Sequence, residues 1–171
     1  MKRLILLTIL LIATTLTYAQ TYNFHTDGNK VYWQKIFESK TDILALLTNS
    51  GKFDDIKEID GVISCRLIPQ QVELHGRSRG SVPGFLLLEN ITAFVRIQQK
   101  EGRYRVTINE ITFITNTTTS LSHQGEHTNI ERYALKRDGT LKPMFLEPGA
   151  QILNKMFTVL FTQQNTLDNN W

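Results

Sequence analysis

Apolar and polar positions alternate along residues 53–67, and this period of two predicts a pair of β-strands. The pair is interrupted by Asp60-Gly61, a dipeptide that favours a two-residue hairpin turn. Pairing the strands across this turn sets Asp55 opposite Arg66, on the face that the apolar side chains avoid. The pattern therefore predicts a hairpin with an ion pair on one face and four apolar positions on the other: Ile56, Ile63, Cys65 and Leu67.

The same alternation predicts a longer hairpin over residues 85–114, with its turn at Glu101-Gly102. Pairing the residues that flank this turn places the apolar positions of both strands on one face. The apolar parity of the second strand shifts near Asn109-Glu110, which indicates a β-bulge. The other face is predicted to be open and to carry one aromatic side chain, two arginines and three hydrogen-bonding side chains: Phe94, Arg96, Gln98, Arg105, Thr107 and Asn109.

One further strand and two helices complete the regular elements. Residues 30–38 are rich in aromatic and β-branched side chains, which predicts a first strand. A short helix is predicted next, with Ser39 or Thr41 as its N-cap and Gly51 just past its end. A second helix is predicted to begin at Pro148 and to bury one apolar stripe. The stripe consists of Ile152, Leu153, Met156, Phe157, Leu160 and Phe161.

The rest of the chain shows no regular period. Residues 69–84 contain two prolines and three glycines, which predicts a loop. Residues 115–147 form an insertion that is too long for a simple connection, so we expect a short hairpin near residues 133–141. The polar tail from residue 163 is expected to fray.

The predicted order is β-α-β-β-β-β-α. Because strands that follow one another through hairpins are antiparallel, this order predicts an α+β fold with two layers. We expect an antiparallel sheet of about five strands with both helices on one face. Residues 20–171 are predicted to form a single domain.

The N-terminus has the pattern of a secretory signal peptide: Lys2 and Arg3, an apolar run over residues 4–13, and small residues up to Ala19. We expect cleavage between Ala19 and Gln20. The apolar run is about half the roughly 20 residues that a membrane-spanning helix needs. Because no cysteine follows the cleavage site to carry a lipid, we expect an exported protein, periplasmic or secreted, with no stable membrane anchor.

Charge and cysteine content narrow the class of protein further. Without residues 1–19 the chain has 17 basic and 16 acidic residues, a net charge of +1. Nucleic-acid-binding proteins usually carry a basic excess, so we expect no nucleic-acid partner. Cys65 is the single cysteine, so the chain cannot form an internal disulfide. Its position among apolar residues predicts a buried structural thiol rather than a nucleophile.

Residues 28–38 (GNKVYWQKIFE), the Asp60-Gly61 hairpin and residues 95–107 (VRIQQKEGRYRVT) carry a family resemblance. In these stretches the chain resembles a family of small exported bacterial domains of unknown function with a TATA-box-binding-protein-like (TBP-like) fold. The resemblance implies that fold and an exported location. It implies no reaction, because the family has no established activity. The insertion at residues 115–147 and the basic loop around Arg77 depart from the family pattern.

One stretch matches a catalytic motif. His123-Gln124-Gly125-Glu126-His127 fits H-x-x-E-H, in which a helix presents two histidines to zinc and the glutamate activates water. Here a glycine interrupts the motif, and no apolar periodicity supports a buried helix around it. The favoured interpretation is a solvated loop, and a small zinc-dependent hydrolase at His123, Glu126 and His127 is the alternative.

Two other features are compatible with binding. His75, Arg77 and Arg79 lie in the glycine-rich loop, where they could contact an anion or serve only solubility. The open sheet face could bind a protein or a glycan through Phe94, Arg96 and Arg105.

The sequence favours an exported, non-catalytic binding module without a cofactor, whose partner in the cell envelope is a protein, a glycan or a small ligand. The second alternative is a carrier of an apolar ligand, with the last helix closing a cavity against the sheet.

Overall fold

The structure is a computed structural model that describes residues 21–38, 40–74, 76–118 and 123–162. Four predictions concern residues outside these ranges. They are the signal peptide with its cleavage site, Ser39 as an N-cap, the position of His75, and the tail from residue 163.

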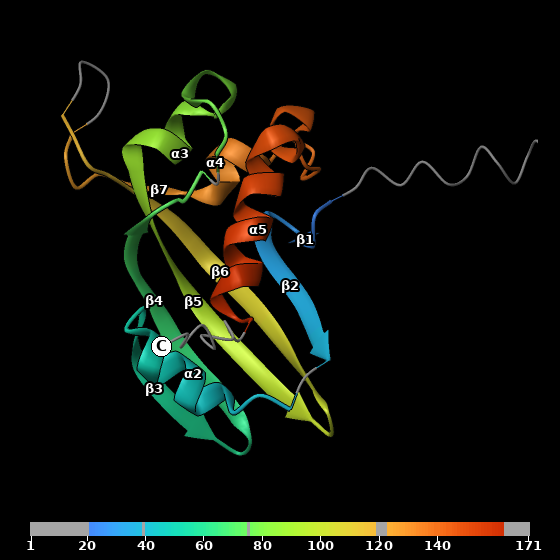
Figure 1. The fold of residues 1–171 in the computed structure, drawn as a ribbon. Coiled ribbons are helices and arrows are strands. Elements are labelled where there is room, and N and C mark those ends of the chain that lie inside the picture. The colour runs from blue at the N-terminus through green and yellow to red at the C-terminus, as the bar shows by residue number, and fades with distance from the viewer. Residues whose placement is uncertain (1–20, 39, 75, 119–122, 163–171) are drawn as a thin grey trace, which may run out of the picture.

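The described residues form one antiparallel sheet covered on one face by helices (Figure 1). The strands are β1 (Phe24–Asp27), β2 (Lys30–Glu38), β3 (Phe53–Ile59), β4 (Val62–Gln71), β5 (Glu89–Lys100), β6 (Arg103–Thr115) and β7 (His127–Asn129). Their spatial order is β1-β2-β6-β5-β4-β3, and β7 also pairs with β6. The sheet thus has two short strands, β1 and β7, beyond the predicted five.

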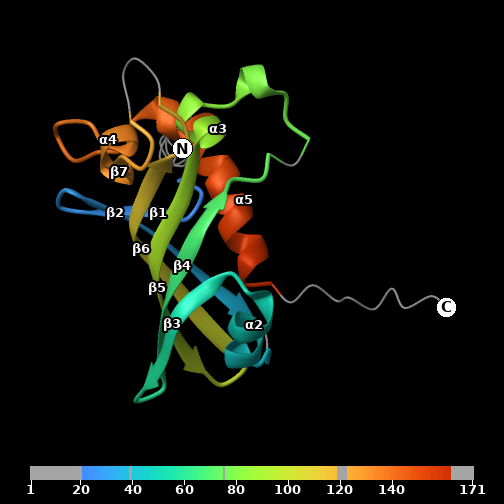
Figure 2. The same cartoon turned by 90° about the vertical axis from the view of Figure 1, so that its left-hand side faces the viewer.

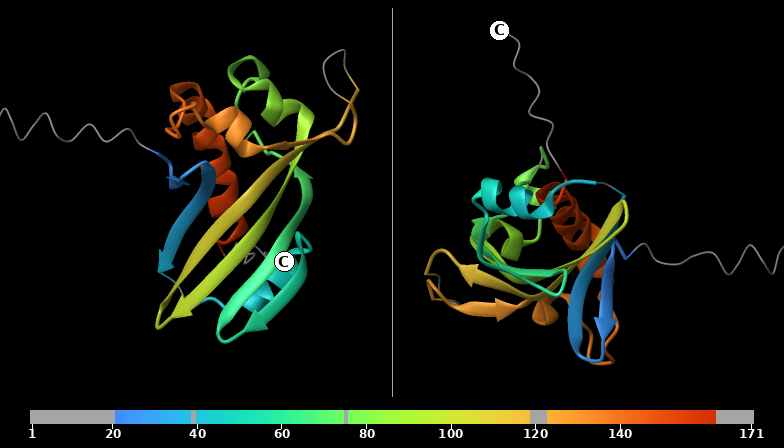
Figure 3. Two further views of the ribbon diagram at one scale, coloured as in Figure 1. Left: turned by 180° about the vertical axis from the view of Figure 1, so that it is seen from behind. Right: turned by 90° about the horizontal axis from the view of Figure 1, so that it is seen from below.

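Two helices, α2 (Ile43–Ser50) and α5 (Gln151–Leu160), lie on the same side of the sheet (Figures 2 and 3). The short helices α3 (Gly84–Leu88) and α4 (Ile130–Ala134) lie at the end of the sheet where β5 begins. The predicted fold class, a two-layer α+β fold with an antiparallel sheet, is confirmed. Among the described residues, no helix is long and apolar enough to cross a membrane.

The apolar stripe of α5 is confirmed, because all six predicted residues are buried. Phe157 contacts Trp33 with ring centroids 5.5 Å apart, and Phe161 contacts Phe53 at 5.5 Å. Lys35 also reaches this helix, where its Nζ donates to the Thr158 hydroxyl at 3.1 Å. These contacts join α5 to β2 and β3 on the inner face of the sheet.

The β5–β6 register is as predicted. Lys100 is opposite Arg103, and the buried positions of the two strands share one face. The bulge is also confirmed: the register shifts opposite Ala93, and Glu110 has a φ of +49°. Because one extra residue on β6 is absorbed there, the alternation resumes with Ile111 facing inward.

The predicted Asp60-Gly61 turn of the β3–β4 hairpin is confirmed, whereas the predicted ion pair of Asp55 with Arg66 is wrong. Ile59 pairs with Val62, but the register shifts between Asp54 and Lys57, and Asp55 has a φ of +50°. A bulge in β3 therefore places Asp54, rather than Asp55, opposite Arg66.

Several predicted element boundaries were wrong. The N-cap of α2 is Asp42, whose carboxylate accepts a hydrogen bond from the Ala45 N–H at 3.0 Å; Gly51 ends the helix as predicted, with a φ of +62°. The predicted strand over residues 85–100 begins only at Glu89, because the short apolar run before it forms α3. Such a run does not distinguish a strand from a buried helix.

Three other boundaries also differ from the prediction. Strand β4 continues through Pro69 into the predicted loop, and its register shifts there, as is usual for proline in a sheet. The predicted hairpin near residues 133–141 is reduced to one bridge between Leu135 and Leu141. Regular α5 starts at Gln151, after the segment Phe145–Ala150, which contains Pro148 and is kinked at Glu147, where the backbone is non-helical (φ −133°, ψ 119°).

Candidate functional site on the outer face of the sheet

The sheet face opposite α2 and α5 carries the side chains that the alternation assigned to an open face. Their neighbours Ala93, Val95 and Ile97 are fully buried, so the intervening residues of β5 point the other way. The register then joins three cross-strand pairs on β5 and β6, which we call the outer-face patch: Phe94 with Asn109, Arg96 with Thr107, and Gln98 with Arg105.

The two arginines of the outer-face patch are exposed, whereas its other four side chains are half-buried. The Arg105 Nε–H donates to the Gln98 Oε1 at 3.2 Å, and the Gln34 Nε2–H donates to the Thr107 hydroxyl at 3.0 Å. Within the described part of the chain, Arg96 and Arg105 form no ion pair. The outer-face patch therefore presents two guanidinium charges that no carboxylate of the described residues neutralises.

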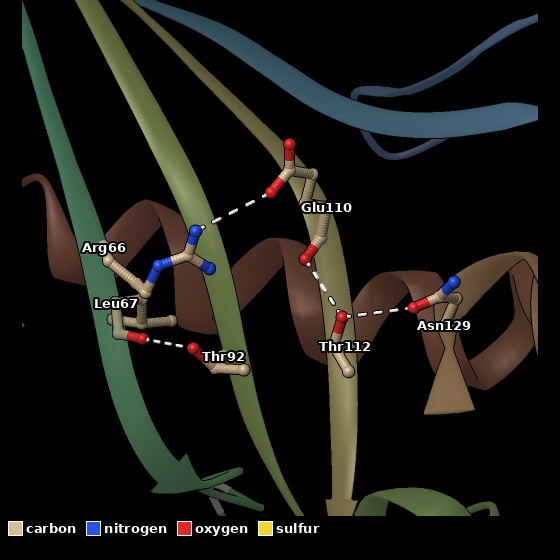
Figure 4. A network of polar contacts seen from close by, with 6 residues as sticks. All are labelled: Arg66, Leu67, Thr92, Glu110, Thr112 and Asn129. Atoms are coloured by element: carbon tan, nitrogen blue, oxygen red, sulfur yellow. Dashed lines mark hydrogen bonds and ion pairs between the residues drawn. The ribbon is translucent and has the colours of Figure 1, made fainter. Parts of the chain in front are cut away.

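A polar network borders the outer-face patch and extends from β4 to β7 (Figure 4). The Arg66 guanidinium reaches across β5 to the Glu110 carboxylate at 3.7 Å. The Thr112 hydroxyl lies 3.2 Å from the Glu110 carbonyl oxygen and 3.3 Å from the Asn129 Oδ1. Both partners of the ion pair are exposed, so its contribution to stability is at most about 1 kcal/mol. It orients Arg66 rather than anchoring the fold.

A pocket of about 350 Å³ opens at the end of the sheet where the β3–β4 and β5–β6 hairpins turn. We call it the hairpin-tip pocket. Arg105 and Gln98 belong both to its lining and to the outer-face patch. The other lining residues are Ile36, Asp60, Gly61, Val62, Gln99, Lys100, Arg103 and Tyr104. The sequence interpretation missed Ile36 and Val62 because it did not assign the pairing of β2 with β6 or of β4 with β5.

The H-x-x-E-H residues lack the helix that zinc binding by this motif requires. Gly125 has a φ of +82°, and the Glu126 carboxylate accepts a hydrogen bond from the backbone N–H of His123 at 3.3 Å. His127 instead begins the short strand β7. In the described ranges, no three His, Cys, Asp or Glu side chains are grouped so that they could hold a metal ion.

The basic loop is tied to the last helix. The Arg77 guanidinium donates to the Gln151 Oε1 at the first turn of α5, and both side chains are exposed. Arg79 lies in a single 3₁₀ turn, Arg79–Ser81. This geometry gives Arg77 a role in holding the loop against α5.

Cys65 lies on the inner face of β4 and is only 1% exposed, as predicted for a structural thiol. Burial, together with the negative charge of Asp54, raises the pKa of this thiol to about 12. Its thiolate fraction at neutral pH is therefore negligible.

We expect Cys65 to resist a thiol reagent such as dithionitrobenzoate at pH 8, because the reagent needs an accessible thiolate. One equivalent should react once the protein is unfolded in guanidinium chloride, since the chain has one cysteine. Rapid reaction of the folded protein would show that β4 opens locally or that the thiol is not buried.

Glu89 and Tyr133 form a polar pair that the sequence interpretation did not identify. The Tyr133 hydroxyl donates to the Glu89 carboxylate at 3.1 Å. Burial raises the pKa of Glu89, and burial together with the neighbouring carboxylate raises the pKa of Tyr133. The Tyr133 ring stacks on Phe85 at a centroid distance of 4.2 Å. The pair therefore joins α4 to the start of β5.

No family model and no curated protein match this sequence. Two solved structures are similar to it. A TBP-like protein from Parabacteroides distasonis is 12% identical, with a TM-score of 0.46 over 80% of this chain and 94% of that one. A DUF4468 family protein from Bacteroides ovatus is 17% identical, with a TM-score of 0.45 over 88% of this chain and 99% of that one. The first of these proteins is described as TBP-like, and the TBP-like fold is the one that the sequence resemblance implies.

Proposed function

We propose that this protein is an exported, non-catalytic binding module whose outer-face patch contacts a protein partner. One observation carries the proposal: Arg96 and Arg105 are exposed on an open sheet face and, among the described residues, have no ion-pair partner. Arginine and aromatic side chains are enriched in protein interfaces, where a planar guanidinium can bind a carboxylate through two hydrogen bonds.

The outer-face patch lies on a rigid part of the sheet, which supports the proposal. The outer-face patch sits on β5 and β6, the two longest strands, and both have neighbouring strands on each side. The inner face of these strands is packed in the core. A binding surface on such a sheet is already ordered before the partner arrives, so less conformational entropy is lost on association.

The test is a crosslinking pull-down from cell envelopes with the variant F94A/R96A/R105A. We expect at least a tenfold loss of the captured partner, because alanine removes the aromatic contact and both guanidinium groups. The melting temperature should change little, since the arginines are exposed and Phe94 is half-buried.

The matched control is the variant L44A/K136A/R137A, which also removes one apolar and two basic side chains. These residues are exposed and lie on α2 and in the turn after α4, and none of them belongs to the outer-face patch. The control should recover the partner as the parent protein does. Equal recovery by the control and by F94A/R96A/R105A would refute the proposal.

A further inference from the structure

The hairpin-tip pocket lies within one continuous row of side chains that crosses the outer face. Successive register partners in this row run from β2 to β3 in the order Ile36, Arg105, Gln98, Val62 and Ile59. The row is polar in the middle and apolar at its ends. Ile36 is 54% exposed and Ile59 is 67% exposed, which makes them two of the large apolar side chains that the core does not cover.

The residues that line the pocket carry a net positive charge. Lys100, Arg103 and Arg105 line it, and Asp60 is its one acidic lining residue. Glu38 and Glu101 lie beside Lys100 and Arg103 at the neighbouring surface, but none of the three cations forms an ion pair within the described ranges. The hydrogen bond from Arg105 to the neutral Gln98 amide orients the guanidinium without neutralising it.

The length of the row limits what can fill it. Neighbouring strands are about 4.8 Å apart, so the four intervals between β2 and β3 span roughly 19 Å. An extended chain advances about 3.3 Å per residue, so about six residues would span the row. The pocket volume of about 350 Å³ lies at the small end of the range for ligand pockets, which suits one or two side chains.

We infer that the hairpin-tip pocket and the row around it bind an extended acidic segment of a partner protein, with carboxylates at Arg103 and Arg105 and apolar side chains over Ile36 and Ile59. The inference rests on the proposed function and names the chemistry of the partner. Charge complementarity favours an acidic segment, and the apolar residues at both ends of the row favour one that also has an apolar side chain near each end.

The probe is a fluorescein-labelled peptide with the sequence LSEESL, measured by fluorescence anisotropy at 20 mM salt. Two matched control peptides are used. LSKKSL changes only the charge of the probe, and SSEESS changes only its apolar ends. We expect LSEESL to bind at least tenfold more tightly than either control. Its binding should weaken at 500 mM salt, because the charges are exposed.

The protein variants are I36S/R103Q and, as a control with the same charge change, L44S/R137Q. Neither Ile36 nor Arg103 belongs to the outer-face patch, and Ile36 is exposed, so the fold should be retained. We expect I36S/R103Q to weaken LSEESL binding at least tenfold and the control to leave it unchanged. Equal binding of LSEESL and LSKKSL, or no binding at millimolar peptide, would overturn the inference.

The pull-down separates this inference from the proposed function. If F94A/R96A/R105A loses the partner and I36S/R103Q keeps it, the proposed function stands and the inference that the pocket binds an acidic segment is refuted. If both variants keep the partner, both proposals fail. Decanoate is the remaining probe. Saturable decanoate binding without peptide binding would assign the pocket to a free amphiphile and would refute the inference that it binds a segment of a protein.

Discussion

Replacement of Trp33 by alanine is expected to lower the free energy of unfolding by about 3–5 kcal/mol, the range typical of a large aromatic residue truncated in a core. Trp33 is fully buried under α5, and its indole contacts Phe157 and, at 6.5 Å, Phe37. Its Nε1–H donates to the Asn154 Oδ1 at 3.0 Å. The substitution removes apolar contacts and one hydrogen bond together. Urea unfolding followed by circular dichroism measures the change.

The variant W33F separates these two contributions. It keeps an aromatic ring but removes the indole donor, and the Asn154 Oδ1 still accepts from the Asn23 Nδ2–H at 2.8 Å. We therefore expect W33F to cost about 1–2 kcal/mol. If W33A cost no more than W33F, the contact between α5 and β2 would contribute little to stability, contrary to the packing described here.

Replacement of Phe113 by alanine is expected to have an effect of similar size, about 3–5 kcal/mol. Phe113 is fully buried on β6 and meets Phe85 of α3 and Tyr133 of α4 edge to face, with ring centroids 5.0 and 5.5 Å away. The substitution should also loosen both short helices. Amide hydrogen exchange would show this as faster exchange in Ile130–Ala134 than in β5.

The variant F113L is the matched control, because it keeps an apolar side chain of comparable size and should cost less than about 1.5 kcal/mol. A small loss of stability in F113A, with unchanged exchange in α4, would mean that the insertion at residues 115–147 packs independently of the core.

The central part of the fold was predictable because it depends on local rules. The Asp60-Gly61 and Glu101-Gly102 turns fix the register of two hairpins next to the turns, and a period of two then assigns the side chains to a face as far as the first bulge. The α5 stripe was predictable for the same reason, since its spacing follows the helix period. The bulge at Glu110 was predictable because it changes the parity of the apolar positions that follow it.

The elements that were missed depend on distant parts of the chain. The bulge at Asp55 leaves little trace in the sequence, because Ile56 is the single apolar residue between Asp54 and Glu58, too few to show a change of parity. Helix α3 forms where a short apolar run packs on Phe113 and Tyr133, so tertiary contacts rather than local preference decide its conformation. Strand β7 exists only because β6 extends beyond its pairing with β2.

The candidate site was likewise predictable only in part. Parity alone placed Phe94, Arg96 and Arg105 together on the outer face. It could not indicate the contribution of Ile36, because the neighbour of β2 in the sheet is β6, far along the chain. The ion pair between Arg66 and Glu110 was missed for a similar reason, since it spans β5 and depends on the β6 bulge.

The placement of β2 beside β6 also determines the order in which the protein can fold during synthesis. Gln34 and its hydrogen-bond partner Thr107 are 73 positions apart. At about 5–20 residues per second, the ribosome makes β2 roughly 4–15 s before its partner strand exists. Throughout that interval the edge of β2 that pairs with β6 has no partner strand, and Trp33 lacks its contact with Phe157 of α5 for longer still. An apolar strand whose edge stays unpaired in this way is prone to aggregation.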